Sequence, residues 1–155
     1  MFSEDKYLYN TNSSFLDFEF ESIGPKGVIK KVARFSEIGT NIYNFGFGDL
    51  HEVTGEISDT VVSNNGDGDK VLITVASIIY DFTSIYAGAA VFIQGTTPSR
   101  TRRYQIGINK FWRQISLVFE VLGLKNEKWE RFRQGQNYDA FLGRRKAFFF
   151  ISNSF

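Results

Sequence analysis

The chain has 155 residues, of which 43% are hydrophobic and 23% charged, and its formal net charge is +1. This length suits one folded domain with a sizeable core, and the 17 phenylalanines exclude a disordered chain, because disordered chains are poor in aromatic residues. The lack of cysteine excludes disulfides, thiolate zinc sites and cysteine nucleophiles. The N-terminal segment MFSEDKYLYN lacks the apolar core of a signal peptide, and no apolar run is long enough to span a membrane. We therefore predict a cytoplasmic protein without a membrane partner.

The near-zero net charge hides an asymmetry along the chain. Residues 1–97 hold 6 Lys or Arg and 13 Asp or Glu, a net charge of −7, whereas residues 98–155 hold 12 and 4, a net charge of +8. A basic part of this kind indicates an anionic partner. The alternative is that the two parts neutralise each other within one fold, and the sequence does not decide between these readings.

The first 63 residues predict an antiparallel meander. Residues 14–23 alternate apolar and acidic side chains, which is the pattern of a half-buried strand. Gly24-Pro25-Lys26-Gly27 is a turn signal, and a return strand at 28–36 follows it. Further strands are expected at 41–48 and 56–63.

Two helices and two strands are predicted after the meander. Asp69 or Asp67 is placed to cap a helix that runs from Lys70 to about Tyr86 on a stripe of apolar residues. The apolar run 89–93 predicts a central strand buried on both faces. The rest of the prediction is a helix capped by Thr97, with Pro98 first and with Tyr104, Ile108, Phe111, Trp112 and Ile115 on one face, then a strand at 117–122 and a less regular basic tail.

The predicted fold is therefore a single α+β domain over residues 1–155, an antiparallel β-meander followed by α-β-α-β.

The segment 95–104 places positive charge where a helix disfavours it. A helix start exposes unpaired amides and the positive end of the helix dipole, which together attract anions. Arginine in the first turn opposes the dipole unless an anion is bound, and its guanidinium matches phosphate and carboxylate geometry. The sequence therefore predicts an anion-binding site made of Thr97, Ser99, Arg100, Thr101, Arg102 and Arg103.

Helical spacing divides these arginines. Arg100 lies four residues before Tyr104 and so shares its apolar stripe, whereas the other two arginines can reach solvent. Arg100 either contributes to anion binding or forms a structural ion pair with a carboxylate such as Asp17 or Asp49, because a partly buried arginine needs a partner.

No metal site is expected. Asp67 and Asp69 do not fit a calcium loop, because Lys70 stands where that loop requires glycine. His51, the only histidine, lies in a polar connection, and we expect it to be a surface residue.

The tail from Lys125 mixes basic and aromatic residues. This pattern suits single-stranded nucleic acid, on which aromatic rings stack, but it equally suits docking of the tail onto the core, which we favour. The aromatic residues concerned are Trp129, Phe132, Tyr138 and Phe141. The apolar segment Phe148–Ile151 is expected to be a buried final strand or a partner-binding patch.

Five motifs, FEFESIGPKG, YNFGFGDL, SNNGDGDKVLITVA, GTTPSRTRRYQIGI and YDAFLGRRK, resemble those of a family of small bacterial proteins of unknown function. The resemblance covers residues 7–146. It implies a genomic-island or toxin–antitoxin-like setting.

The predicted element order also resembles that of the GNAT-type N-acyltransferases, which use acyl-CoA. Their pyrophosphate loop has the pattern Arg/Gln-x-x-Gly-x-Gly/Ala, and residues 63–68 match its glycines, Gly66 and Gly68, but not its leading Arg or Gln. The resemblance implies that Tyr104 would protonate the departing thiolate and that acetyl-CoA would be the cofactor. Asp67 and Asp69 would repel a pyrophosphate.

These observations lead to one favoured function and two alternatives. We favour a binding module without a cofactor that engages nucleic acid or an acidic partner protein through the arginine-rich helix start. The alternatives are a GNAT-like acyltransferase and a toxin–antitoxin component. The sequence leaves open the ligand, the oligomeric state and whether the protein is an enzyme.

Overall fold

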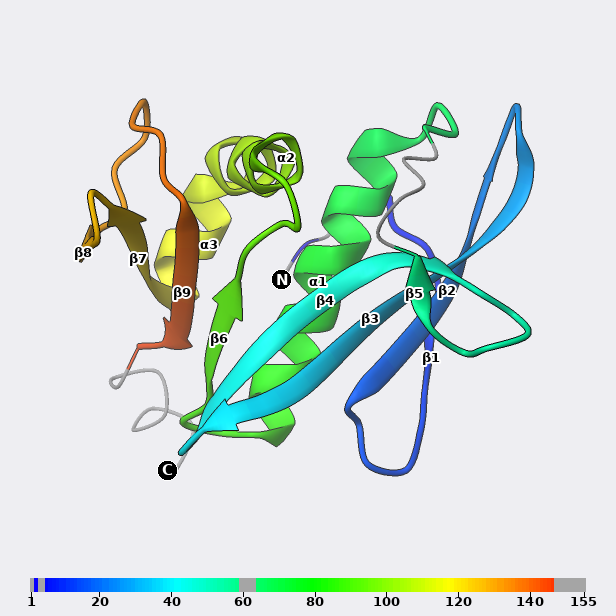
Figure 1. Cartoon of the computed structure of the whole chain (residues 1–155), viewed down its shortest axis with the longest axis horizontal. Coiled ribbons are helices and arrows are strands. Elements are labelled where there is room, and N and C mark those ends of the chain that lie inside the picture. Colours follow the sequence, from blue (N-terminus) through cyan, green and yellow to red (C-terminus); the bar gives the residue numbers. More distant parts are fainter. Residues whose placement is uncertain (1, 3–4, 59–63, 147–155) are drawn as a thin grey trace. The chain divides into compact units, whose positions relative to one another are not determined.

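The computed structural model of the protein describes residues 2, 5–58 and 64–146 and has an α+β fold (Figure 1). The chain forms two compact units: unit 1 comprises Met1–Ser36 and Phe45–Ile85, and unit 2 comprises Glu37–Asn44 and Tyr86–Phe155. The predicted α+β class is confirmed, whereas a single domain over residues 1–155 stays a prediction.

Unit 1 is built on an antiparallel sheet whose strands follow the chain order, so the predicted meander is confirmed. The fourth predicted strand is confirmed at β5, while residues 59–63 lie outside the described residues. The strands are β1 (Asn10–Thr11), β2 (Asp17–Gly24), β3 (Gly27–Gly39), β4 (Ile42–Leu50) and β5 (Ile57–Ser58), which pairs with β4. The end of β3 and the start of β4 fall within Glu37–Asn44 and so belong to unit 2.

The aromatic side of this sheet packs against α1 (Gly68–Ile85). Phe18 and Phe20 of β2 are buried, while Glu19 between them and Glu21 after them are exposed, as the alternating pattern predicted. Phe35 of β3 stacks on Phe82 of α1, with ring centroids 3.8 Å apart. Burial of each phenylalanine contributes about 1.5–3 kcal/mol, so these rings form the centre of the unit 1 core.

α1 is covered on more than one side. The N-terminal segment supplies a second layer: the Tyr7 backbone N–H donates to Thr74 Oγ1 at 2.9 Å, and the Tyr9 hydroxyl donates to Asp81. The buried residues of α1 are Ile73, Thr74, Val75, Ser77, Ile78, Phe82 and Thr83. No helix in the described part of the chain is long and apolar enough to cross a membrane.

A buried asparagine fixes the loop before α1 to the β2–β3 hairpin. Asn65 Oδ1 accepts from the Lys26 backbone N–H at 2.7 Å, and its Nδ2 donates to the Gly27 carbonyl at 2.9 Å. At Gly24 an added Cβ would lie 1.8 Å from the Asn65 carbonyl oxygen. Only glycine permits this approach, and the contact therefore depends on both residues.

Asp67 completes the attachment and precedes the helix. Its carboxylate accepts from the hydroxyls of Tyr7 and Ser22, each at 2.6 Å. Its carbonyl accepts from the Val71 N–H at 3.0 Å, which makes Asp67, one of the two predicted capping residues, the residue that leads into α1. Asp69 lies in the first turn.

Unit 2 contains an antiparallel sheet in the order β6-β9-β7-β8, so β9, the last strand of the described residues, lies between β6 and β7. Both helices of the unit pack on one face of this sheet, where Tyr104, Ile108 and Trp112 contact a cluster of Phe132, Tyr138 and Phe141. The elements are β6 (Ala90–Ile93), α2 (Pro98–Lys110), α3 (Trp112–Val118), β7 (Phe119–Lys125), β8 (Lys128–Arg131) and β9 (Ala140–Arg145).

The structure corrects several predictions for this unit. The apolar stripe does not form one helix, because the backbone leaves the helical conformation at Phe111 (φ −104°, ψ 18°) between α2 and α3. Leu117 belongs to α3, and β7 begins at Phe119. In β6, Val91 is buried but Phe92 and Ile93 are half-buried, so the strand is not buried on both faces.

The expected irregular tail forms β8 and β9. These strands are too short to show a clear period of two, and pairing with β7 stabilises them. The predicted segment Phe148–Ile151 lies outside the described residues.

Asn65→Ala tests the attachment of the loop to the hairpin. We expect the free energy of unfolding to fall by about 2–3 kcal/mol, because the substitution leaves the Lys26 N–H and the Gly27 carbonyl unpaired. Chemical denaturation measures the loss. The matched control is Asn64→Ala, since Asn64 is exposed and its side chain accepts, among the described residues, only from the Gly66 N–H. Equal losses in the two variants would contradict the proposed attachment.

Stability should also fall at alkaline pH. Burial, reinforced by the hydrogen bond to Asp81, raises the pKa of Tyr9 above its usual range, and burial with the hydrogen bond to Asp67 raises the pKa of Tyr7. A tyrosine with a raised pKa stabilises the fold at any pH below its unfolded-state pKa of about 10. This contribution is lost as the pH rises through the folded-state pKa. Denaturation at a series of pH values should show a shallower alkaline loss in Tyr9→Phe than in the wild type. An unchanged pH dependence would show that Tyr9 is not responsible.

Candidate anion-binding site

The start of α2 lies directly on Gly95. A Cβ at this position would be 2.4 Å from the Thr101 nitrogen, so the contact requires glycine. The Gly95 N–H donates to Thr101 Oγ1 at 3.0 Å, and that hydroxyl donates to the Thr97 carbonyl at 3.3 Å. Thr101 is buried. Its hydroxyl is therefore engaged within the fold, and a part for Thr101 in anion binding stays a prediction.

Thr97 caps α2 as predicted. Its Oγ1 accepts from the Arg100 N–H at 3.2 Å, and its carbonyl accepts from the Thr101 N–H at 3.1 Å. Pro98 has no N–H, so Ser99 is the one first-turn residue whose amide makes no hydrogen bond to the described residues. An anion at this helix start would find a single free amide. Binding must therefore rely mainly on side chains.

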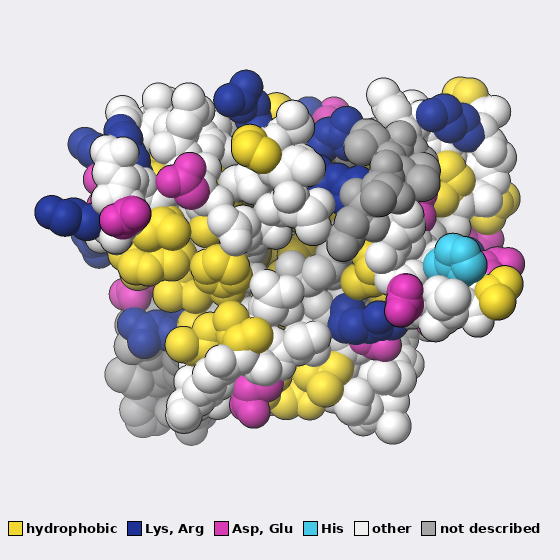
Figure 2. Space-filling view, viewed as in Figure 1, with side chains coloured by type: hydrophobic (Ala, Val, Ile, Leu, Met, Phe, Trp, Pro, Cys, Tyr) yellow, Lys and Arg dark blue, Asp and Glu magenta, His cyan; other side chains and the backbone are white. Residues whose placement is uncertain are grey.

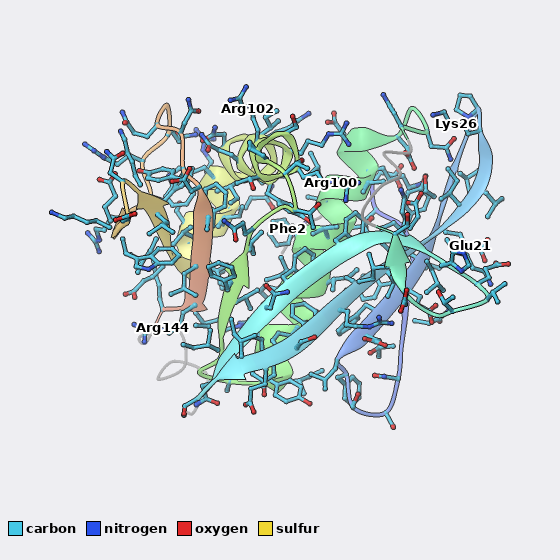
Figure 3. All side chains as sticks on the ribbon, in the orientation of Figure 1. Phe2, Glu21, Lys26, Arg100, Arg102 and Arg144 are labelled. Carbon is cyan, nitrogen blue, oxygen red and sulfur yellow. The ribbon has the colours of Figure 1, made fainter. Side chains whose placement is uncertain are left out.

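Arg100 differs in position from the outer arginines. It is half-buried, and in Figure 3 it lies on a different side of α2 from Arg102. Both carboxylates suggested as its partners have other ion pairs in unit 1. Asp17 accepts from Arg34 at 2.9 Å, and Asp49 accepts from Lys31. An ion pair between Arg100 and a carboxylate stays a prediction.

The exposed side of α2 and α3 is positively charged. Arg102 and Arg103 of α2 are exposed and form no ion pair with any described residue, and the same holds for Arg113 of α3. Residues 98–118 hold five Lys or Arg and no Asp or Glu. Figure 3 shows Arg102 projecting outward from α2. We call Arg102, Arg103, Lys110 and Arg113 the basic helical face.

Two members of this face, Lys110 and Arg113, are not among the site residues that the sequence predicted. Lys110 follows Arg103 by seven residues, or about two helical turns, and this spacing was the available signal. Arg113 lies beyond the break at Phe111, and its placement required the structure.

The loop that the acyltransferase resemblance assigns to pyrophosphate is filled by groups of the protein itself. The Gly66 N–H donates to Asn64 Oδ1 at 3.1 Å, and Gly68 is the first residue of α1. The Asp67 carboxylate is held between two hydroxyls at this loop, and Asp69 adds a second negative charge. A pyrophosphate here would meet these carboxylates, which disfavours binding of acetyl-CoA.

The remaining candidate residues, Tyr104 and His51, make contacts within the fold. Tyr104 packs against the core cluster of unit 2, and its role as a general acid stays a prediction. His51 is exposed, as expected, and its Nδ1 accepts from the Thr54 N–H at 3.3 Å. Within residues 2, 5–58 and 64–146, no three His, Asp or Glu gather where they could hold a metal ion.

The aromatic residues of the basic tail divide into two groups. Phe132, Tyr138 and Phe141 are buried, so for these three the preferred interpretation, core packing, is confirmed. Trp129 is 42% exposed and is absent from that cluster.

Residues 3–146 match the family described as Family of unknown function (DUF6934). The chain belongs to this family. The match confirms the resemblance that the five motifs indicated and covers nearly the same residues. No curated protein and no solved structure matches the chain significantly, so nothing supports the resemblance to the acyltransferases. Membership in DUF6934 assigns no activity, and a function must be argued from the site.

Substitutions of Thr97 test the local electrostatics of the helix start. Thr97→Asp should raise the free energy of unfolding by about 0.5–1 kcal/mol, because it keeps the cap and places a negative charge at the positive end of the dipole. Thr97→Ala should lower it by about 1 kcal/mol. Thermal denaturation at low salt compares the stability of the two variants with that of the wild type. The assignment of the cap is wrong if Thr97→Ala is as stable as the wild type.

Proposed function

We propose that the protein is a binding module that holds the phosphate backbone of a nucleic acid on its basic helical face. The observation that carries this proposal is the exposed positive charge on α2 and α3, which no acidic residue of these helices offsets. Basic side chains that cluster on one surface repel one another and do not stabilise the fold. Such a cluster is therefore typical of a surface that binds an anion.

The chemistry of this face favours phosphate. Guanidinium groups bind phosphate oxygens through paired hydrogen bonds. Each strand of a duplex offers one charge per about 3.4 Å of helix axis. The row from Arg103 to Lys110 is about 10 Å long at the rise of an α-helix and so reaches more than one phosphate. An acidic partner protein is the competing ligand, and the experiment below separates the two.

The double variant Arg102→Glu/Arg103→Glu tests the proposal. We expect the affinity for a labelled oligonucleotide, measured by fluorescence anisotropy, to fall about ten-fold or more, and that of the wild type to fall steeply with salt. Thermal stability should stay nearly unchanged, because both side chains are exposed.

The matched control is Lys6→Glu/Lys26→Glu, which makes the same change of charge at exposed positions of unit 1. It should bind like the wild type. Equal affinities of the two double variants would show that net charge and not this face matters. If the wild type bound polyglutamate but no oligonucleotide, the ligand of the basic helical face would be an acidic protein.

A further inference from the structure

The sheet of unit 2 has a second face that α2 and α3 do not cover. Paired residues of neighbouring strands point to the same side of a sheet, and side chains alternate along each strand. The helices pack against the side that carries Ile93, Val121 and Phe141. The opposite side, which we call the open sheet face, carries Phe92 of β6, Leu142 of β9, Leu122 and Leu124 of β7, and Trp129 and Arg131 of β8.

Two aromatic rings meet across this face. The ring centroids of Phe92 and Trp129 are 6.2 Å apart, and the two ring planes meet at 75°. Their strands, β6 and β8, are separated by β9 and β7, or about 14 Å at the usual strand spacing. Both side chains therefore lean inward over the middle strands, where Leu122 and Leu142 are half-buried. Figure 2 shows the resulting hydrophobic patch over β6, β9 and β7.

Positive charge lies beside these rings. Arg131 follows Trp129 by two residues on the same side of β8, is exposed, and forms no ion pair with the described part of the chain. Arg144 of β9, labelled in Figure 3, lies on the same side toward the other end of the sheet. Its side chain is 61% exposed although it pairs with Glu120 at 3.4 Å.

This combination fits a ligand that is both aromatic and anionic. A purely apolar partner surface would desolvate the Arg131 guanidinium, which has no ion pair in the described part of the chain, without offering it a counter-charge, and this is costly. Unpaired bases, by contrast, stack on exposed aromatic rings while their phosphates bind arginine. Duplex DNA keeps its bases stacked inside the helix and offers no ring to Trp129.

We propose that the open sheet face binds the unpaired bases of a single-stranded nucleic acid, with Trp129 as the stacking platform and with Arg131 and Arg144 contacting phosphates of the same strand. The inference rests on the proposed function and adds to it the class of nucleic acid. The basic helical face supplies backbone charge to any polyanion, whereas the open sheet face selects single strands.

Trp129→Ala tests the inference against three probes: a single-stranded oligonucleotide of about twelve nucleotides, long enough to cover one such surface, a duplex of the same length, and inorganic polyphosphate. We expect the affinity for the single strand to fall about ten-fold, as loss of one stacked base predicts, and the other two affinities to stay unchanged. Trp129→Phe should retain most of the affinity, and Leu117→Ala, which removes an exposed apolar side chain from α3, should bind all probes like the wild type.

Tryptophan fluorescence provides a second readout that needs no folded alanine variant. The single strand should quench the wild type, polyphosphate should not, and Trp129→Phe should lose the quenching while Trp112 remains. The inference fails if Trp129→Ala binds the single strand as tightly as the wild type, or weakens all three probes equally. It also fails if the wild type is a dimer that Trp129→Ala dissociates, because a second copy would then cover the face.

The two proposals fail in different ways. Normal binding of all three probes by Arg102→Glu/Arg103→Glu would overturn the proposed function. Loss of binding in that variant, together with an unaffected Trp129→Ala, would overturn the inference alone.

Discussion

The pairing of β9 with two neighbours is the constraint on which the functional part of the molecule depends. β9 is hydrogen-bonded to β6 on one side and to β7 on the other. Successive side chains of a strand point to opposite faces of the sheet. Phe141 is therefore fully buried beneath the helices, while Leu142, the next residue, lies on the open sheet face. One short strand thereby defines the core of unit 2 and the surface opposite to it.

The two candidate surfaces of unit 2 have different chemistry for the same architectural reason. Helices that cover one side of a sheet turn their polar side outward, and here that side holds arginine and lysine from a segment, residues 98–118, that contains no Asp or Glu. The uncovered side of the sheet keeps apolar residues, whose exposure is limited by the contact between Phe92 and Trp129. Charge on one surface supplies attraction to a polyanion, and rings on the other supply selectivity for unstacked bases.

Unit 1 uses its polar residues internally. Asn65 and Asp67 attach the loop before α1 to the β2–β3 hairpin, and Asp17 and Asp49 pair with basic residues of the same unit. Groups that are already hydrogen-bonded are costly to free for a ligand. This explains why the glycine-containing loop, although it resembles a phosphate loop in sequence, is a structural element in this fold.

The sequence by itself determined the features that depend on near neighbours along the chain. Alternation predicted β2, helical spacing predicted α1, and Thr97 followed by Pro98 predicted the start of α2, because these signals act within one or two turns. The exposure of Arg102 and Arg103 followed from the same spacing. Only the tertiary structure decided that Thr101 is buried and that β8 and β9 exist. It alone brought Phe92 to Trp129, 37 residues away, since that contact arises from pairing between distant strands, which no local pattern encodes.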